Sequence, residues 1–139
     1  MTAWSEIERQ VRQRAAERCE YCRMHQSLQG ATFHVEHIIP RSLGGRSQLD
    51  NLAWACPSCN LHKSNRVDVQ VPDTDKTIPL FNPRSHDWDI HFRWNGYRVV
   101  GRTSIGQATV DALSLNHARR IKIRQAEELF GLFPPTDDE

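Results

Sequence analysis

The apolar residues near the N-terminus recur with the period of an α-helix. They stand three or four positions apart and form one narrow stripe, made of Trp4, Ile7, Val11 and Ala15. The residues between them are mostly helix formers, and Ser5 and Glu8 have the spacing of a capping box. The pattern therefore predicts a helix over residues 5–18 whose apolar stripe packs on the core.

The middle of the chain has the short apolar runs that are typical of β-strands. The apolar and β-branched residues among positions 33–39 suggest a short strand, and Pro40 ends this run. A polar, glycine-rich loop without a pattern of its own follows, and residues 51–55 (NLAWA) form a second short run. Pro57 stands where the first residue of a helix often does. We therefore expect an irregular hairpin followed directly by a helix over PSCNLHKSNR.

The C-terminal half alternates between turn signals and periodic segments. Residues 67–87 are rich in Pro and Asp, show no period, and are interpreted as an extended connection that wraps the core. Asn95-Gly96 separates two strand-like runs, which is a strong signal for a hairpin with a type I′ turn. A helix is expected after Gly106, and Asn116 is expected to cap a second one. The whole pattern predicts an α+β fold.

Composition and charge narrow the class of protein. The 139 residues, 38% of them hydrophobic and 25% charged, suit a single globular domain. No apolar run approaches the ~20 residues that span a bilayer, and the N-terminus lacks the apolar core of a signal peptide. We therefore expect a cytoplasmic protein without a membrane partner. Because the net charge is only +1, a polyanion would have to be held by a local patch and a metal ion.

The cysteines form two Cys-x-x-Cys pairs, Cys19/Cys22 and Cys56/Cys59, about 33 residues apart. In a reducing compartment, two such pairs suit a tetrahedral zinc site better than two disulfides. A redox or disulfide role is the alternative. The sequence thus predicts a structural zinc ion that staples a small core.

Between and beside these pairs the chain reads FHVEHIIPRSLGG and DNLAWACPSCNLHK. These motifs resemble those of the HNH endonucleases over residues 19–66, about a third of the chain. The resemblance implies a ββα-metal core of the HNH or His-Me finger type, stapled by a zinc ion on the four cysteines. It also implies hydrolysis of DNA phosphodiester bonds to 5′-phosphate and 3′-hydroxyl ends. We accordingly assign the nuclease core and N-terminal helix to residues 1–66, with residues 67–139 packed on it.

The resemblance gives four residues their expected roles. His37 is the general base, and an imidazole with an ordinary pKa near ~6.5 suits that task. Glu36 and Asn60 supply oxygen ligands to a catalytic Mg²⁺ or Mn²⁺ ion. Asn51 resembles the middle Asn of the motif, whose side chain ties down the loop and so orients the base. The structural alternatives are a surface histidine, a solvated strand carboxylate and a hydrogen bond at the helix start.

Two positions depart from the usual motif. Glu36 stands where the family usually has Asp, and Asn60 stands where many members have His. The Asn form favours Mg²⁺ or Mn²⁺ over softer metals. Neighbouring residues of a regular strand face opposite ways, so Glu36 and His37 can share a site only where the strand ends or bulges. We predict such an irregularity there.

Basic residues around the motif are candidates for contacts with backbone phosphates. They are Arg41, Arg46, Lys63 and Arg66, and His34 is a further candidate on the first strand. The alternative is that they are exposed charges on a solvated face.

Two other functions remain open at this point. One is a zinc-stapled module that binds nucleic acid without cleaving it. The other is a nuclease with the same site that acts on RNA or branched DNA. DNA is the expected partner of the leading hypothesis, and double-strand cleavage would require a homodimer or two successive events, because one site cuts one strand.

Overall fold

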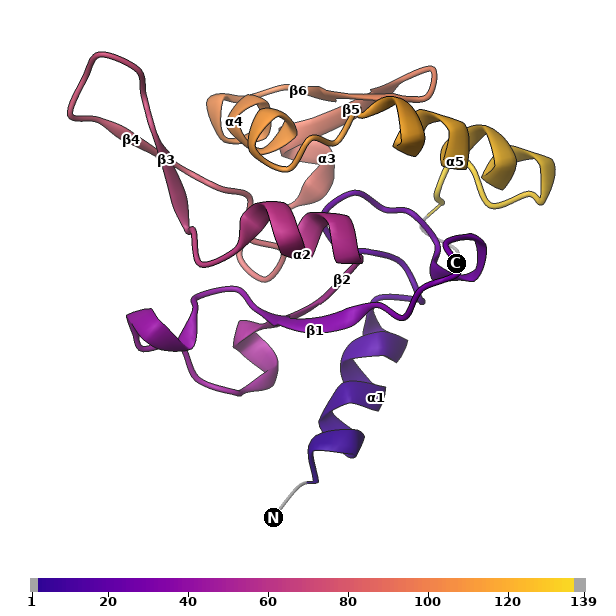
Figure 1. Ribbon diagram of the computed structural model, residues 1–139, viewed down its shortest axis with the longest axis horizontal. Helices are drawn as coiled ribbons and strands as arrows, with labels where there is room; N and C mark the ends of the chain where they lie inside the picture. The colour runs from indigo at the N-terminus through magenta and orange to yellow at the C-terminus, as the bar shows by residue number, and fades with distance from the viewer. Residues whose placement is uncertain (1–2, 137–139) are drawn as a thin grey trace.

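The computed structural model describes residues 3–136 and contains helices together with three antiparallel pairs of strands (Figure 1). The helices are α1 (Trp4–Arg14), α2 (Pro57–Lys63), α3 (Trp88–His91), α4 (Ser104–Ala112) and α5 (Ala118–Leu129). The strands are β1 (His34–His37), β2 (Leu52–Ala55), β3 (Asp68–Gln70), β4 (Thr77–Pro79), β5 (Phe92–Asn95) and β6 (Arg98–Gly101). This mixed content agrees with the expected α+β class. No helix within residues 3–136 has the length and apolar character needed to cross a bilayer.

Helix α1 begins one residue earlier and ends four residues sooner than predicted. Its N-cap is Ala3, which makes no side-chain hydrogen bond, so the expected capping box of Ser5 and Glu8 is wrong. Ser5 instead lies inside the first turn. The helix ends because Ala16 and Glu17 take positive φ angles of 54° and 62°, which a right-handed helix cannot accommodate.

The apolar stripe of α1 packs against β1 and β2, except at its first residue. Val11 is fully buried, while Ile7 and Ala15 lie partly buried against the core. Trp4 keeps 46% of its surface exposed. It is therefore an aromatic residue at the surface rather than part of the core.

Strands β1 and β2 form the predicted hairpin, and α2 follows directly. The pairing runs without interruption from His34 opposite Ala55 to His37 opposite Leu52. The loop between the strands is more ordered than expected, because it contains short 3-10 turns at Arg41–Leu43 and Leu49–Asn51. Pro57 is the first residue of α2, as predicted.

The C-terminal half differs from the sequence prediction in three places. Residues 67–87 contain the hairpin β3–β4, which projects from the body of the molecule (Figure 1). Its strands are three residues long, too short for a periodic signal. In the next hairpin Asn95 pairs with Arg98, so the turn consists of Gly96 and Tyr97, one position later than predicted. The start of the predicted strand, Trp88–His91, is the short helix α3.

Asn116 does not cap α5. Its side chain bonds both backbone groups of Val99, at 2.7 and 2.8 Å, and so joins the start of α5 to strand β6. The residue at the N-cap is His117, whose ring accepts a hydrogen bond from the Arg119 N–H. A capping motif and a tertiary hydrogen bond compete for the same amide, and the tertiary bond is the one made.

The far end of α5 is joined to the segment that follows α1. The Glu127 carboxylate, 1% exposed, accepts a hydrogen bond of 2.7 Å from the His25 N–H. The buried Arg18 donates 2.7 Å to the Leu132 carbonyl. These contacts connect residues more than 100 positions apart and hold the C-terminal helix on the N-terminal segment.

We expect the parent chain to lose stability relative to a Glu127→Gln variant as the pH rises from about 4 to about 6. Burial raises the pKa of Glu127 from 4.5 to about 6, despite the His25 hydrogen bond and the charge of Arg18. The unfolded chain, with its lower pKa, releases the proton first, so the stability contributed by the protonated carboxyl is lost as the pH rises through about 6.

Urea unfolding midpoints at about pH 4, 5, 6 and 7 measure this change, which amounts to about 2 kcal/mol at most. The variant keeps an oxygen that accepts the His25 hydrogen bond, so it is the matched reference. A difference between the two chains that stays constant over this range would contradict the assignment.

Candidate functional site

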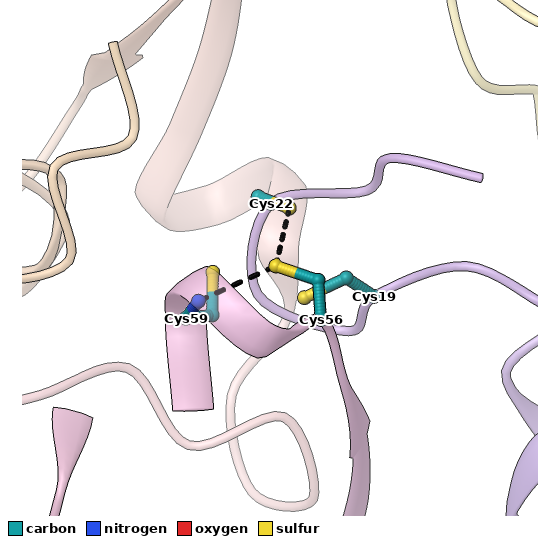
Figure 2. A group of neighbouring side chains, drawn as sticks. All are labelled: Cys19, Cys22, Cys56 and Cys59. Atoms are coloured by element: carbon teal, nitrogen blue, oxygen red, sulfur yellow. Dashed lines mark hydrogen bonds between the residues drawn. The ribbon is translucent and has the colours of Figure 1, made fainter. Parts of the chain in front are cut away.

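The four cysteines converge in the interior, as shown in Figure 2, and are called the thiol cluster below. Their sulfur atoms all lie within 4.8 Å of one another, all four residues are buried, and no disulfide joins them. Cys22 Sγ and Cys56 Sγ are 3.8 Å apart. A zinc ion with Zn–S bonds of ~2.3 Å in a tetrahedron places its sulfurs about 3.8 Å apart. The thiol cluster is therefore compatible with the structural zinc predicted from the sequence.

Local backbone bonds bring the two pairs together. A turn closed by hydrogen bonds from Cys19 N–H to Met24 O (2.9 Å) and from Arg23 N–H to Cys19 O (2.8 Å) presents the first pair. Glu20 N–H donates to Trp54 O at 2.8 Å, which attaches this turn to β2. The second pair begins where β2 ends and lies on the first turn of α2.

The pKa values of the buried thiols shift in different directions. Burial raises the pKa of Cys19 and of Cys59 well above the ordinary value. It opposes ionisation of Cys22 too, but hydrogen bonds from the other three thiols and the charge of Arg120 outweigh it and lower the pKa of Cys22. A buried site of four thiolates therefore needs a cation at its centre.

His37 is the last residue of β1 and is half-buried. Its Nε2 lies 2.8 Å from the Ser47 hydroxyl. The Trp4 ring lies parallel to the imidazole, with 6.4 Å between centroids and 6° between planes. Burial, and next the charge of Arg41, lower the pKa of His37 below 6.5. The imidazole therefore has the Ser47 hydroxyl at one ring nitrogen and the Trp4 ring beside it, and its surroundings disfavour the charged form.

Glu36 lies in a different environment from His37. It is 6% exposed, and its Oε2 accepts a hydrogen bond of 2.6 Å from the Tyr21 hydroxyl. Lys63 Nζ is 2.5 Å from Oε1, an ion-pair distance, although it is not aligned for a hydrogen bond. Burial raises the pKa of Glu36 in spite of Lys63 and Tyr21. The sequence predicted that the strand ends or bulges at Glu36 and His37. Strand β1 does end at His37, and it contains no bulge.

The expectation that Lys63 contacts backbone phosphates needs correction. Lys63 is 1% exposed, and its ammonium also donates 2.9 Å to the Ile38 carbonyl. An ammonium group cannot remain buried without a counter-charge, and Glu36 provides it. In this arrangement Lys63 joins α2 to β1 and does not reach the surface.

Asn51 and Gly45 shape the loop beside His37. The Asn51 amide accepts from Ile39 N–H at 2.9 Å and donates 3.0 Å to both Ile39 O and Arg46 O, so it connects the loop to the end of β1. A Cβ atom on Gly45 would lie 1.7 Å from Ile39 O. Only glycine lets the loop pass this close to the strand.

Asn60 follows Cys59 in α2 and is half-buried. Its backbone makes ordinary helical bonds to Cys56 O (2.9 Å) and from Ser64 N–H (3.1 Å). The helix thus places the Asn60 side chain one residue away from the thiol cluster.

The remaining candidates for phosphate contact lie at the surface. Three of them have exposed side chains: His34, Arg41 and Arg46. Arg66 is exposed as well, but its guanidinium donates to His62 O at 2.5 Å and to Ala112 O at 3.3 Å. Arg66 therefore holds the end of α2 against α4.

Three neighbours of the candidate residues escaped the sequence analysis. Tyr21 is the third residue of the CEYC turn, Ser47 stands in the polar loop, and Trp4 belongs to the predicted stripe. Tyr21 and Ser47 carried no periodic or spacing signal. For Trp4 the misleading signal was the helical stripe itself, which predicted burial.

Removing the Trp4 ring should raise the pKa of His37 toward its ordinary value. The ring lies parallel to the imidazole and burial is the main cause of the lowered pKa, so removing the ring should expose His37 further to water. NMR titration of the His37 ring in Trp4→Ala measures the change, and Trp4→Phe should restore most of it. His86, which packs on Phe81 instead, is the internal control. Equal His37 titrations in all three chains would contradict the stacking.

A comparison with known protein families finds a match over the segment that contains these candidate residues. Residues 19–66 match the family model of the HNH endonucleases, which confirms the resemblance seen in the sequence. The segment 19–66, about a third of the chain, is therefore similar to an HNH endonuclease domain.

Among curated proteins, the chain is similar to the Septu protein PtuB of Bacillus thuringiensis. The two are 26% identical over 106 residues, which cover 75% of this chain and 38% of that protein. The chain thus spans well under half of this relative's length. No solved structure matches the chain significantly.

Proposed function

We propose that the chain is a metal-dependent endonuclease that hydrolyses phosphodiester bonds of DNA, with His37 as the general base. The observation that carries the proposal is the His37 imidazole, which is half-buried at the end of β1, lies 2.8 Å from the Ser47 hydroxyl and has a pKa that burial and Arg41 lower. A proton acceptor in this state is what the attack of water on a phosphodiester requires.

In the proposed reaction, His37 accepts a proton from a water molecule as the water oxygen attacks phosphorus. The new oxygen–phosphorus bond forms while the bond from phosphorus to the 3′ oxygen breaks. The 3′ oxygen leaves and takes a proton from solvent, which gives a 3′-hydroxyl and a 5′-phosphate. Arg41, exposed and close enough to affect the pKa of His37, would oppose the negative charge of the phosphate.

Glu36 and Asn60 would hold the Mg²⁺ or Mn²⁺ ion, since both offer oxygen atoms that these ions prefer. Of the two Glu36 oxygens, Oε1 is the candidate ligand, because Oε2 accepts the Tyr21 hydrogen bond. Lys63 would have to withdraw from Oε1, because its Nζ lies 2.5 Å away. When bound, such an ion stabilises charge on the phosphate oxygens and on the leaving oxygen.

The proposal extends to the rest of the chain. Residues 1–66 would form the nuclease core and residues 67–139 would pack on it. Exposed groups on the loop and beside it would contact backbone phosphates: Arg41 and Arg46 on the loop, His34 on β1, and Arg66 after α2 if it leaves the carbonyls of His62 and Ala112. A homodimer, or two successive events, would be needed for double-strand cleavage.

The Glu36–Lys63 pair favours a second candidate, a zinc-stapled module that binds nucleic acid without cleaving it. A carboxylate already neutralised by an ammonium has no need of a metal ion. The two candidates differ in a plasmid-nicking assay with Mg²⁺, with Mn²⁺ and with a chelator present. We expect metal-dependent nicking, and intact supercoiled DNA under every condition would favour the binding module.

The same assay extends to the choice of substrate. Duplex DNA, single-stranded DNA, branched DNA and RNA of matched sequence should be compared at equal enzyme concentration. We expect DNA to be cleaved faster than RNA. A preference for RNA or for the branched substrate would select the alternative nuclease function.

A further inference from the structure

The C-terminal helix α5 contacts the thiol cluster through one buried side chain. Arg120, 3% exposed, donates from Nη1 to Cys59 Sγ at 3.1 Å. Its Nη2 donates 2.6 Å to the Ser58 hydroxyl and 2.9 Å to the Leu113 carbonyl. The guanidinium thus connects α5 to Cys59 in the first turn of α2, which lies 61 positions earlier in the chain.

This contact matters because the zinc-loaded thiol cluster carries a net negative charge. Four thiolates around one Zn²⁺ ion leave a net charge of −2, and all four cysteines are buried. A charge in the interior is destabilising unless nearby groups compensate it. A guanidinium is permanently charged, so its hydrogen bond to a thiolate sulfur is charge-assisted and stronger than a neutral one.

A second arginine on the same helix lies one turn further along. Arg124 is fully buried, close enough to Cys22 and Cys59 for their charges to interact. Its guanidinium donates to Tyr97 O and Leu115 O, at 2.8 and 2.7 Å. Arg124 supplies positive charge near the cluster, whereas Arg120 is the one that touches sulfur.

We propose that Arg120 is a positioning residue of the zinc centre, which donates a hydrogen bond to the Cys59 thiolate and compensates the negative charge of the thiol cluster. Helix α5 would then complete the zinc site from outside its four ligands. This role does not depend on nuclease activity. It also gives the C-terminal half a role. Arg120 on α5 would support the metal ligand Cys59 at the start of α2, and Cys59 directly precedes Asn60.

An ordinary structural arginine would explain the bonds to Ser58 and Leu113 equally well, so the test must report on the metal. Zinc affinity is measured by competition with a chromogenic chelator for the parent chain and for Arg120→Gln, Arg120→Lys and Arg119→Gln. Arg119 is the exposed neighbour on α5 and serves as the matched control. Circular dichroism confirms that each chain is folded.

Arg120→Gln should lower zinc affinity at least ~10-fold, the usual effect of losing a group that supports a metal ligand. Arg120→Lys keeps the charge but not the fork of donors, so an intermediate loss is expected. Arg119→Gln should stay within about twofold of the parent. A folded Arg120→Gln chain with parental zinc affinity would overturn the proposal.

A measurement on the parent chain keeps the test decisive if the variants do not fold. In protein loaded with ¹¹³Cd in place of zinc, an NMR coupling across the hydrogen bond should connect the metal to an Arg120 guanidinium proton. Arg119 should show none. The absence of any Arg120 coupling, together with solvent exchange as fast as that of Arg119, would overturn the proposal.

Discussion

Replacing His37 with glutamine should lower the rate of DNA cleavage at least ~100-fold while the chain stays folded, because general-base catalysis contributes ~10²–10⁴-fold to such reactions. Glutamine can still bond the Ser47 hydroxyl, which lies 2.8 Å from the His37 ring, but it cannot accept a proton at neutral pH. Single-turnover cleavage of a labelled duplex measures the chemical step directly.

The matched control is His62→Gln, because His62 is an exposed histidine whose ring bonds the Ser58 carbonyl within α2. This variant should cleave at the parental rate. Circular dichroism and the zinc content of both variants should equal those of the parent. A His37→Gln chain that cleaves as fast as the parent would remove His37 from the reaction.

The second large effect is expected at the thiol cluster: Cys56→Ser should leave the core unfolded. Cys56 is fully buried, and its sulfur accepts a hydrogen bond from the Cys59 N–H at the start of α2. Structural zinc contributes an apparent ~10–16 kcal/mol in small zinc-binding domains. That amount is comparable to the whole ~5–15 kcal/mol by which a native domain is stable.

Thermal melting followed by circular dichroism, with zinc measured by elemental analysis, tests this expectation. A strong chelator should unfold the parent chain in the same way. Added zinc should then refold the parent but not Cys56→Ser, which makes the chelated parent the control. A variant that melts cooperatively like the parent, without zinc, would show that the fold does not require the metal.

These two expectations come from parts of the chain that the sequence described well. The two Cys-x-x-Cys pairs, the strand–strand–helix order and Pro57 at the first position of α2 are local features. Each is set by spacing or by the conformational limits of single residues, so each can be predicted without knowing what packs on it. The convergence of the four thiols follows from the same spacing.

Predictions that needed packing partners were less accurate. Ser5 and Glu8 do not cap α1, because the helix already starts at Trp4. Asn116 bonds strand β6 instead of capping α5. The turn of the β5–β6 hairpin moved by one residue, because strand pairing extends to Asn95 and Arg98. For Asn116 and for the hairpin turn, a weak local preference gave way to a tertiary hydrogen bond or to strand register.

The sequence by itself determined that this chain carries an HNH-type segment with a thiol cluster able to bind zinc and with Glu36 and His37 side by side in the chain. Only the tertiary structure decided what each group touches. Lys63 turned inward to Glu36, Trp4 stacked on His37, and Arg120 reached Cys59. The physical reason is that backbone spacing fixes the order of groups, whereas burial and charge compensation depend on residues brought together from distant parts of the chain.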